Sequence, residues 1–128
     1  MASDGISITG GPDHHQVCLE QDGQIVAAAD VDFTTAAGTV RAVLHSRVQP
    51  LPAHIGRRLV DAVVDLLEGT GATQLNAAVS AVDVEMVQRL RERTHDVSTR
   101  LAGTTTVLIT AHPAPSPAAP STPKADRA

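Results

Sequence analysis

The segment that decides the fold spans residues 51–71 and reads LPAHIGRRLVDAVVDLLEGTG. Apolar residues recur there at three- and four-residue intervals, which is typical of a helix with one buried face. These apolar positions are Ile55, Leu59, Val63, Leu66 and Leu67. Pro52 precedes the pattern and Gly69 follows it, as proline and glycine commonly do at helix ends. The sequence therefore predicts a helix from about Ala53 to Glu68.

Four strands are predicted before this helix, the first around Ile6 and Ile8 and the others over residues 15–21, 24–34 and 39–48. The third alternates apolar and polar residues, which indicates a strand with one buried face. The residues expected on that face are Ile25, Ala27, Ala29, Val31 and Phe33. Asp22-Gly23 predicts a tight hairpin turn before this strand, because both residue types tolerate a positive φ.

After the helix the sequence predicts a strand over residues 73–79, a second helix from about residue 84 to 94, and strands over 96–101 and 104–110. The apolar stripe of the second helix is expected to consist of Val84, Val87 and Leu90. Because the helices follow a run of consecutive strands, we expect an α+β fold. The expected architecture is a largely antiparallel mixed sheet with two helices.

Composition divides the chain into two parts. Residues 1–112 contain nearly all the apolar residues and predict a single compact α/β domain. Phe33 is the only aromatic residue, so the core must be aliphatic. Residues 113–128 are rich in proline and alanine and lack the apolar surface that offsets the entropy of ordering. We expect this tail to be disordered.

Several classes of function are disfavoured by composition. A net charge of −4 and the lack of aromatic stacking platforms argue against a nucleic-acid partner. Cys18 is the only cysteine, which excludes an intramolecular disulfide and a multi-cysteine zinc site, and the histidines show no metal-ligand spacing. No signal peptide or membrane-spanning run is visible. We therefore expect no metal, no membrane association and a cytoplasmic location.

The element order and residues 51–62 resemble the GNAT acyltransferase superfamily. In that family a strand ends in a loop of pattern Q/R-x-x-G-x-G/A, which leads into a long helix and holds the pyrophosphate of acyl-CoA on backbone amides. Gly56 matches the last small position of the pattern. The resemblance implies that Ile55, Gly56 and Arg57 would offer N–H groups to acetyl-CoA. It also implies that Val48 and its strand neighbours would line the pantetheine arm.

The chain also departs from the family pattern. Leu51 stands where Gln or Arg is expected, and His54 stands where the first glycine is expected. A side chain at that glycine position obstructs a close approach to the backbone. The two helices that the family usually has between its first two strands are missing, and without any tyrosine the family's general acid cannot be present.

Two groups of polar residues are candidates for chemistry. His45 is the best candidate for a general base, because imidazole titrates near neutrality; the alternative is a surface histidine on a polar strand face. Asp30 and Asp32 lie two residues apart on one strand and so share a face. Such a pair can hold a cation or raise one pKa, whereas the alternative is a solvated strand face.

Three functions follow from these observations. The first is a small noncatalytic GNAT-like domain that acts through protein contacts or as a ligand sensor. The second is a minimal acetyl-CoA-dependent N-acetyltransferase, which is the only one of the three that implies a cofactor. The third is a homo-oligomer built through exposed sheet edges without a ligand. An acetyltransferase needs a gap between the strands around Val48 and Leu75, together with free amide groups at residues 55–57. In a noncatalytic relative we expect that gap to be filled, with Leu51 or His54 as the candidate residues.

Overall fold

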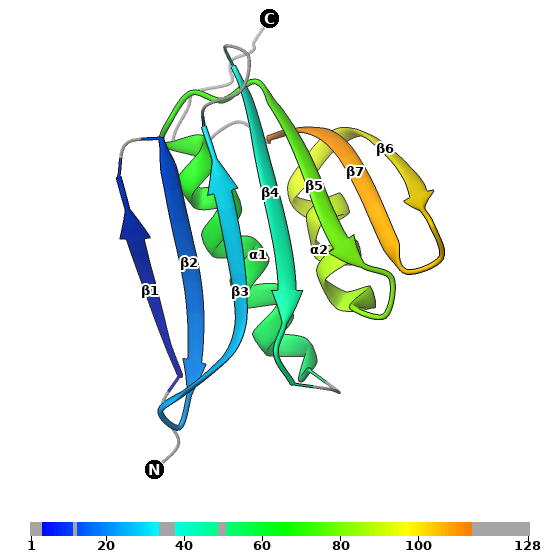
Figure 1. The fold of residues 1–128 in the computed structure, drawn as a ribbon. Coiled ribbons are helices and arrows are strands. Elements are labelled where there is room, and N and C mark those ends of the chain that lie inside the picture. Colours follow the sequence, from blue (N-terminus) through cyan, green and yellow to red (C-terminus); the bar gives the residue numbers. More distant parts are fainter. Residues whose placement is uncertain (1–3, 12, 34–37, 49–50, 114–128) are drawn as a thin grey trace, which may run out of the picture.

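The computed structural model describes residues 4–11, 13–33, 38–48 and 51–113. Its elements are β1 (Asp4–Gly10), β2 (His14–Gln21), β3 (Gln24–Asp32), β4 (Thr39–Ser46), α1 (Ala53–Glu68), β5 (Gln74–Ser80), α2 (Val84–Arg93), β6 (Thr94–Ala102) and β7 (Thr106–Pro113). Their order is the predicted one, and α1 has the predicted bounds (Figure 1). The predicted disordered tail lies outside the described residues from position 114 onward.

The seven strands form one sheet in the order β1-β2-β3-β4-β5-β7-β6. The pairing of β4 with β5 is parallel, and the other five pairings are antiparallel. A parallel pair needs a crossover connection, and α1 lies within it. The structure therefore confirms the α+β class and the largely antiparallel mixed sheet.

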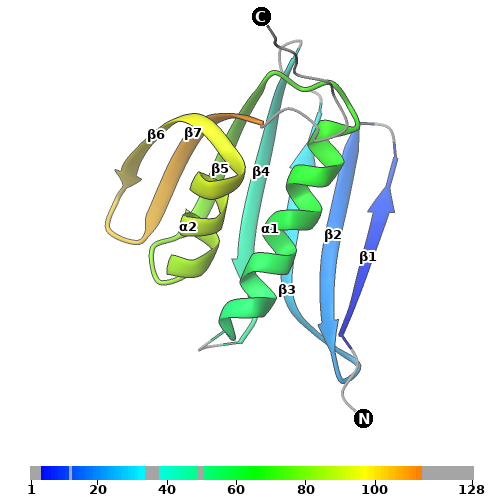
Figure 2. The same cartoon turned by 180° about the vertical axis from the view of Figure 1, so that it is seen from behind.

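Both helices cover the same face of the sheet: they lie behind it in Figure 1 and in front of it in Figure 2. Aliphatic side chains fill the space between the two layers, with Leu59 and Leu67 of α1 fully buried beside Leu75 of β5. Each buried leucine of this kind contributes about 1.5–3 kcal/mol through loss of apolar surface from water. The opposite face of the sheet carries no helix among the described residues.

The hairpin turn between β2 and β3 was predicted correctly, because neighbouring residues in the sequence determine its conformation. Asp22 and Gly23 have φ values of 53° and 81°, as the hairpin turn requires. On β3, however, Ile25 is 38% exposed and Val26 is buried. The reason is a register shift beside Leu19, where the pairing passes from Ala27 directly to Ile25 and leaves Val26 as an extra residue. The expected placement of Ile25 on the buried face was therefore wrong.

The buried stripe of α2 also differs from the prediction. Met86 and Leu90 are buried, one turn apart, whereas Val84 is 60% exposed. Val84 is the first residue of the helix and is not part of its buried face. Val87 packs against the margin of the core. A period of 3.6 residues allowed both interpretations, and the packing against α1 selects between them.

Candidate functional site

The start of α1 is the position where the family resemblance placed a cofactor loop. The amides of Ile55 and Gly56 both donate to the carbonyl of Pro52, at 3.0 Å and 3.2 Å. The amide of Arg57 lies one residue deeper in the helix, where N–H groups bond to the carbonyl four residues earlier. These three N–H groups are thus used within the helix and are not directed at a ligand.

Gly56 is buried in a contact between the two helices. A Cβ at this position would lie 3.2 Å from Cγ of Met86 and 3.6 Å from Cδ2 of Leu51. The glycine therefore lets α2 approach α1 closely, and the space beside it is filled by the side chains of Met86 and Leu51. Leu51 is therefore in contact with Gly56, whereas His54 is exposed. Neither residue lines the hollow at the ends of β4 and β5, where a gap between the strands was expected.

The hollow beside this contact is small, and its lining combines apolar residues with two carboxylates. It has a volume of about 130 Å³, and its lining includes Asp83 and Glu85. Carboxylates repel a pyrophosphate, which carries negative charge of its own. Arg57 is exposed and lies 3.8 Å from Oε1 of Glu92, so its charge is partly offset.

Strands β4 and β5 stay paired almost to the end of β5. Their parallel pairing continues to Leu44 opposite Val79, the second-last residue of β5. Beyond that point the hydroxyl of Ser46 donates to the carboxylate of Asp83, with oxygen separations of 3.2 Å and 3.3 Å. Asp83 is only 7% exposed and Ser46 is half-buried, so a partly buried hydrogen bond joins the end of β4 to the start of α2. Val48 packs against the core margin.

A network of charges fastens α2 to α1. Asp61 accepts hydrogen bonds from Nε of Arg89 at 2.8 Å and from Nη1 of Arg93 at 2.7 Å, and Arg93 also bonds Asp65 at 2.8 Å. Partial burial acts to raise the pKa of Asp61, but the hydrogen bonds and charges of the two arginines outweigh it and leave that pKa below its ordinary value. This network holds α2 in the position from which Met86 packs against Gly56 near the start of α1. The arrangement around α1 does not fit acetyl-CoA.

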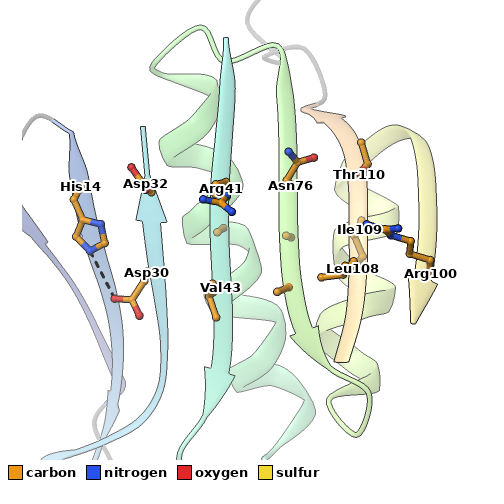
Figure 3. Close-up of a pocket in the computed structure, with 13 residues that line it drawn as sticks. His14, Asp30, Asp32, Arg41, Val43, Asn76, Arg100, Leu108, Ile109 and Thr110 are labelled. Atoms are coloured by element: carbon orange, nitrogen blue, oxygen red, sulfur yellow. Dashed lines mark ion pairs between the residues drawn. The ribbon is translucent and has the colours of Figure 1, made fainter. Parts of the chain in front are cut away.

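The open face of the sheet carries a hollow of about 670 Å³ (Figure 3). Register pairing places side chains in cross-strand rows along this face. The middle row runs across five strands as Asp30, Val43, Ala78, Leu108 and Arg100. Its centre is apolar, and its ends carry opposite charges. Strands lie about 4.8 Å apart, so the two charged Cα atoms are separated by roughly 19 Å.

A second row borders this floor two residues further along the strands. It runs as Asp32, Arg41, Asn76 and Thr110. Figure 3 shows the Arg41 guanidinium above the middle of the sheet, between the side chains of Asp32 and Asn76. The hollow therefore has an apolar floor, a polar side and two charged ends, which is the usual composition of a binding site.

Asp30 is the centre of a polar cluster at one end of the hollow. Its carboxylate accepts a hydrogen bond from Gln16 at 3.3 Å and lies 3.8 Å from Nε2 of His14 and 3.7 Å from Nε2 of His45. The structure thus brings the proposed base, His45, to Asp30. It does not bring His45 to Gly56, which lies on α1 behind the sheet. Within the described part of the chain, no group of three or more His, Cys, Asp or Glu side chains is arranged so that it could hold a metal ion.

The sequence interpretation missed Asn76, Arg100 and Thr110 as members of one site. Each is a polar residue on an alternating strand, so the signal for a solvent-facing position was present. What was missing was the register that aligns β5, β7 and β6. Within the described residues, no helix has the length and apolar character needed to cross a bilayer.

Comparisons with known proteins give the same fold. No family model and no curated protein matches the sequence. The chain superposes on the ribosomal-protein-S18-alanine N-acetyltransferase from Escherichia coli with a TM-score of 0.58, at 17% identity, over 84% of this chain and 73% of that one. It also superposes on the IAA acetyltransferase from Bacillus cereus with a TM-score of 0.60, at 11% identity, over 86% of this chain and 99% of that one.

A GNAT-family acetyltransferase from Streptococcus pneumoniae matches with a TM-score of 0.58 at 10% identity, over 79% of this chain and 67% of that one. Against several such structures the chain spans only about two thirds of the length. The chain therefore has the GNAT fold. At these identities the likeness concerns the fold alone.

Proposed function

We propose that this chain is a noncatalytic GNAT-fold domain that binds a ligand on the open face of its sheet. The observation that supports this most directly is the closed start of α1, where Leu51 and Met86 pack on Gly56. The amides of Ile55 and Gly56 are bonded to Pro52, and carboxylates border the remaining space. The position that would receive acetyl-CoA in an acetyltransferase is used for helix packing.

The open-face hollow defines what such a ligand must look like. Its apolar floor favours aliphatic groups, Asp30 favours a cation at one end, and Arg100 favours an anion at the other. The separation of roughly 19 Å between these ends corresponds to about six extended residues at 3.3 Å each. A short peptide segment with a basic residue near one end and an acidic residue near the other fits this pattern. The ligand class is therefore a segment of a protein partner.

A thermal melt with and without acetyl-CoA tests the noncatalytic assignment. A ligand present at a hundredfold excess over Kd stabilises the folded state by about 2.7 kcal/mol. We expect no change in Tm at millimolar acetyl-CoA, whereas the Escherichia coli acetyltransferase in the same assay should shift upward. A saturable upward shift for this chain would contradict the proposal.

Peptide binding is tested separately with two synthetic hexapeptides of equal composition. One carries lysine at one end, glutamate at the other and aliphatic residues between them; the second has its two charges adjacent at the centre. We expect fluorescence anisotropy to detect binding of the first only, and the Arg100→Ala variant to weaken it by about tenfold. Equal binding of both peptides, or of neither, would contradict the proposed ligand class.

The alternative, a minimal N-acetyltransferase, is favoured by one further observation. His45 borders a hollow of about 300 Å³ at the ends of β4 and β5, together with Ser80 and Thr106. An imidazole there could take a proton from an amine. This alternative predicts acetyl transfer to amine acceptors that is lost in His45→Ala, and a radiolabel transfer assay would detect it. The noncatalytic proposal predicts no transfer with either protein.

A further inference from the structure

The two edges of the sheet differ in how they are protected against pairing with another strand. The edges are β1 and β6. Strand β6 carries His95, Asp96 and Arg100, and its register shifts between His95 and Ser98. Charged residues and bulges of this kind are the usual means by which an edge strand avoids further pairing. This edge is protected.

Strand β1 lacks those features over most of its length. It reads DGISITG, with its single charged residue at the first position and a regular register against β2. It also exposes apolar surface, because Ile6 is 39% and Ile8 is 47% exposed. In the described part of the chain β1 pairs with a strand on one side only. An edge strand with alternating exposed isoleucines is a template for an added strand.

A groove adjoins this edge on the helix side. It has a volume of about 500 Å³ and lies between β1 and α1. Ile6 and Ile8 form one wall. The α1 wall combines apolar Ala62 and Leu66 with the charged residues Arg58, Asp61 and Asp65. An added strand that presented apolar side chains on this face would cover the exposed isoleucines and fill part of the groove.

The pattern of β1 is self-complementary. In an antiparallel pairing of two β1 strands about a twofold axis at Ser7, Ile6 of one chain stands opposite Ile8 of the other. Residues directly opposite each other interact most strongly in antiparallel pairs. The same register places Asp4 opposite Gly10, so the two acidic residues do not face each other. The twofold axis is perpendicular to the sheet, and it therefore leaves all four isoleucines on the helix side.

From these observations we propose that β1 is a homodimer interface, in which two chains pair their β1 strands antiparallel about Ser7 and form one continuous sheet. The inference does not rest on the proposed peptide-binding function, because that site lies on the opposite face of the sheet. A seven-residue strand pair buries less surface than a standard interface. The dimer should therefore be reversible and dependent on concentration.

The test is sedimentation velocity of the full chain from about 1 to 500 µM. We expect the wild type to move from the chain mass of 13.3 kDa toward twice that value. Ile8→Lys should remain monomeric across the range, because it places a charge in the centre of the pair. Leu101→Lys is the matched control: Leu101 is 64% exposed on the β6 edge, and its replacement should leave dimerisation unchanged.

A cross-linking pair keeps the proposal testable if Ile8→Lys fails to fold. Directly opposed Cα atoms in antiparallel strands lie about 5 Å apart, which a disulfide can span. In a Cys18→Ala background, Ser7→Cys should form a covalent dimer on oxidation. Thr9→Cys should not, because Thr9 stands opposite Gly5 and its Cα lies about 14 Å from that of its own copy.

Three results would overturn self-pairing at β1. One is a wild type that stays monomeric at 500 µM, which would leave this edge as an acceptor for a strand from a different protein. Another is a dimer that Leu101→Lys disrupts and Ile8→Lys does not. The third is equal cross-linking of Ser7→Cys and Thr9→Cys.

Discussion

The two faces of the sheet are built from the same strands and serve different purposes. On β4, Val40, Ala42 and Leu44 face the helices and are almost fully buried, whereas Arg41 and Val43 between them are exposed. The helix-covered face supplies the packing that stabilises the domain. The open face contributes little to the core and is free to carry charges and a hollow. Core residues and the residues that line the hollow thereby alternate along each strand.

The largest change in the free energy of unfolding is expected from a substitution on the helix-covered face of the sheet. Leu75→Ala removes a fully buried side chain from β5, and the resulting cavity should lower the free energy of unfolding by about 2–5 kcal/mol. The control is Val43→Ala on the neighbouring strand, which is 48% exposed on the open face and should cost about 0.5 kcal/mol. Denaturant unfolding measures both. Similar losses for the two variants would show that the faces do not differ as described.

The next largest effect on stability is expected at the ion pairs that hold α2 against α1. Asp61→Asn weakens the bonds to Arg89 and Arg93 and should cost about 1 kcal/mol, after allowance for partial solvent exposure. Because the folded pKa of Asp61 is lowered, its contribution is present above the unfolded pKa near 4 and is lost as the pH falls through the folded value.

Unfolding experiments at pH 7 and at pH 2–3 measure this contribution. The difference in stability between wild type and Asp61→Asn should be largest at pH 7 and should shrink in acid. Asp65→Asn, at a residue whose side chain is 68% exposed, should show a smaller difference at both pH values. A difference for Asp61→Asn that grows in acid would contradict the assigned ion pairs.

A smaller effect is expected at the helix contact itself. Gly56→Ala gains about 1 kcal/mol of helix propensity, but the new Cβ lies 3.2 Å from Met86. Methionine is flexible and can move by a few tenths of an ångström. The net change should therefore stay within about 1 kcal/mol by thermal unfolding. A loss above about 3 kcal/mol would mean that Met86 cannot move and that the contact is tighter than described.

The smallest effect on stability is expected on the open face. Arg41 is exposed above the hollow, and Arg41→Ala should change the free energy of unfolding by no more than about 0.5 kcal/mol. If Arg41 forms part of the peptide site, binding of the charge-separated hexapeptide should weaken in the same variant. A variant that is strongly destabilised would place this residue in the scaffold instead of the site.

The sequence was sufficient for features that depend on neighbouring residues. The periodicity of residues 53–68 predicted α1, and Asp22-Gly23 predicted the hairpin turn between β2 and β3. It was insufficient where distant residues meet. The resemblance of Gly56 to a cofactor loop is local, whereas its burial depends on Met86, which lies thirty positions later.

The hollow shows the same limit. Alternation indicated a polar strand face for Asp30 and Asp32, but their alignment with Arg41, Asn76 and Arg100 depends on pairing between strands. Pairing register is a tertiary property and could not be obtained from one sequence. The hydrogen bond from Ser46 to Asp83 belongs to the same class of long-range contact.

The central claim is that the start of α1 is closed to acetyl-CoA, and NMR tests it most directly. Amide resonances of ¹⁵N-labelled protein would be followed while acetyl-CoA is added to about 5 mM. We predict no saturable shift at Ile55, Gly56 or Arg57, because the first two amides are bonded to Pro52 and the helix start is packed against Met86. Saturable shifts centred on these three residues would contradict the account and support the acetyltransferase alternative.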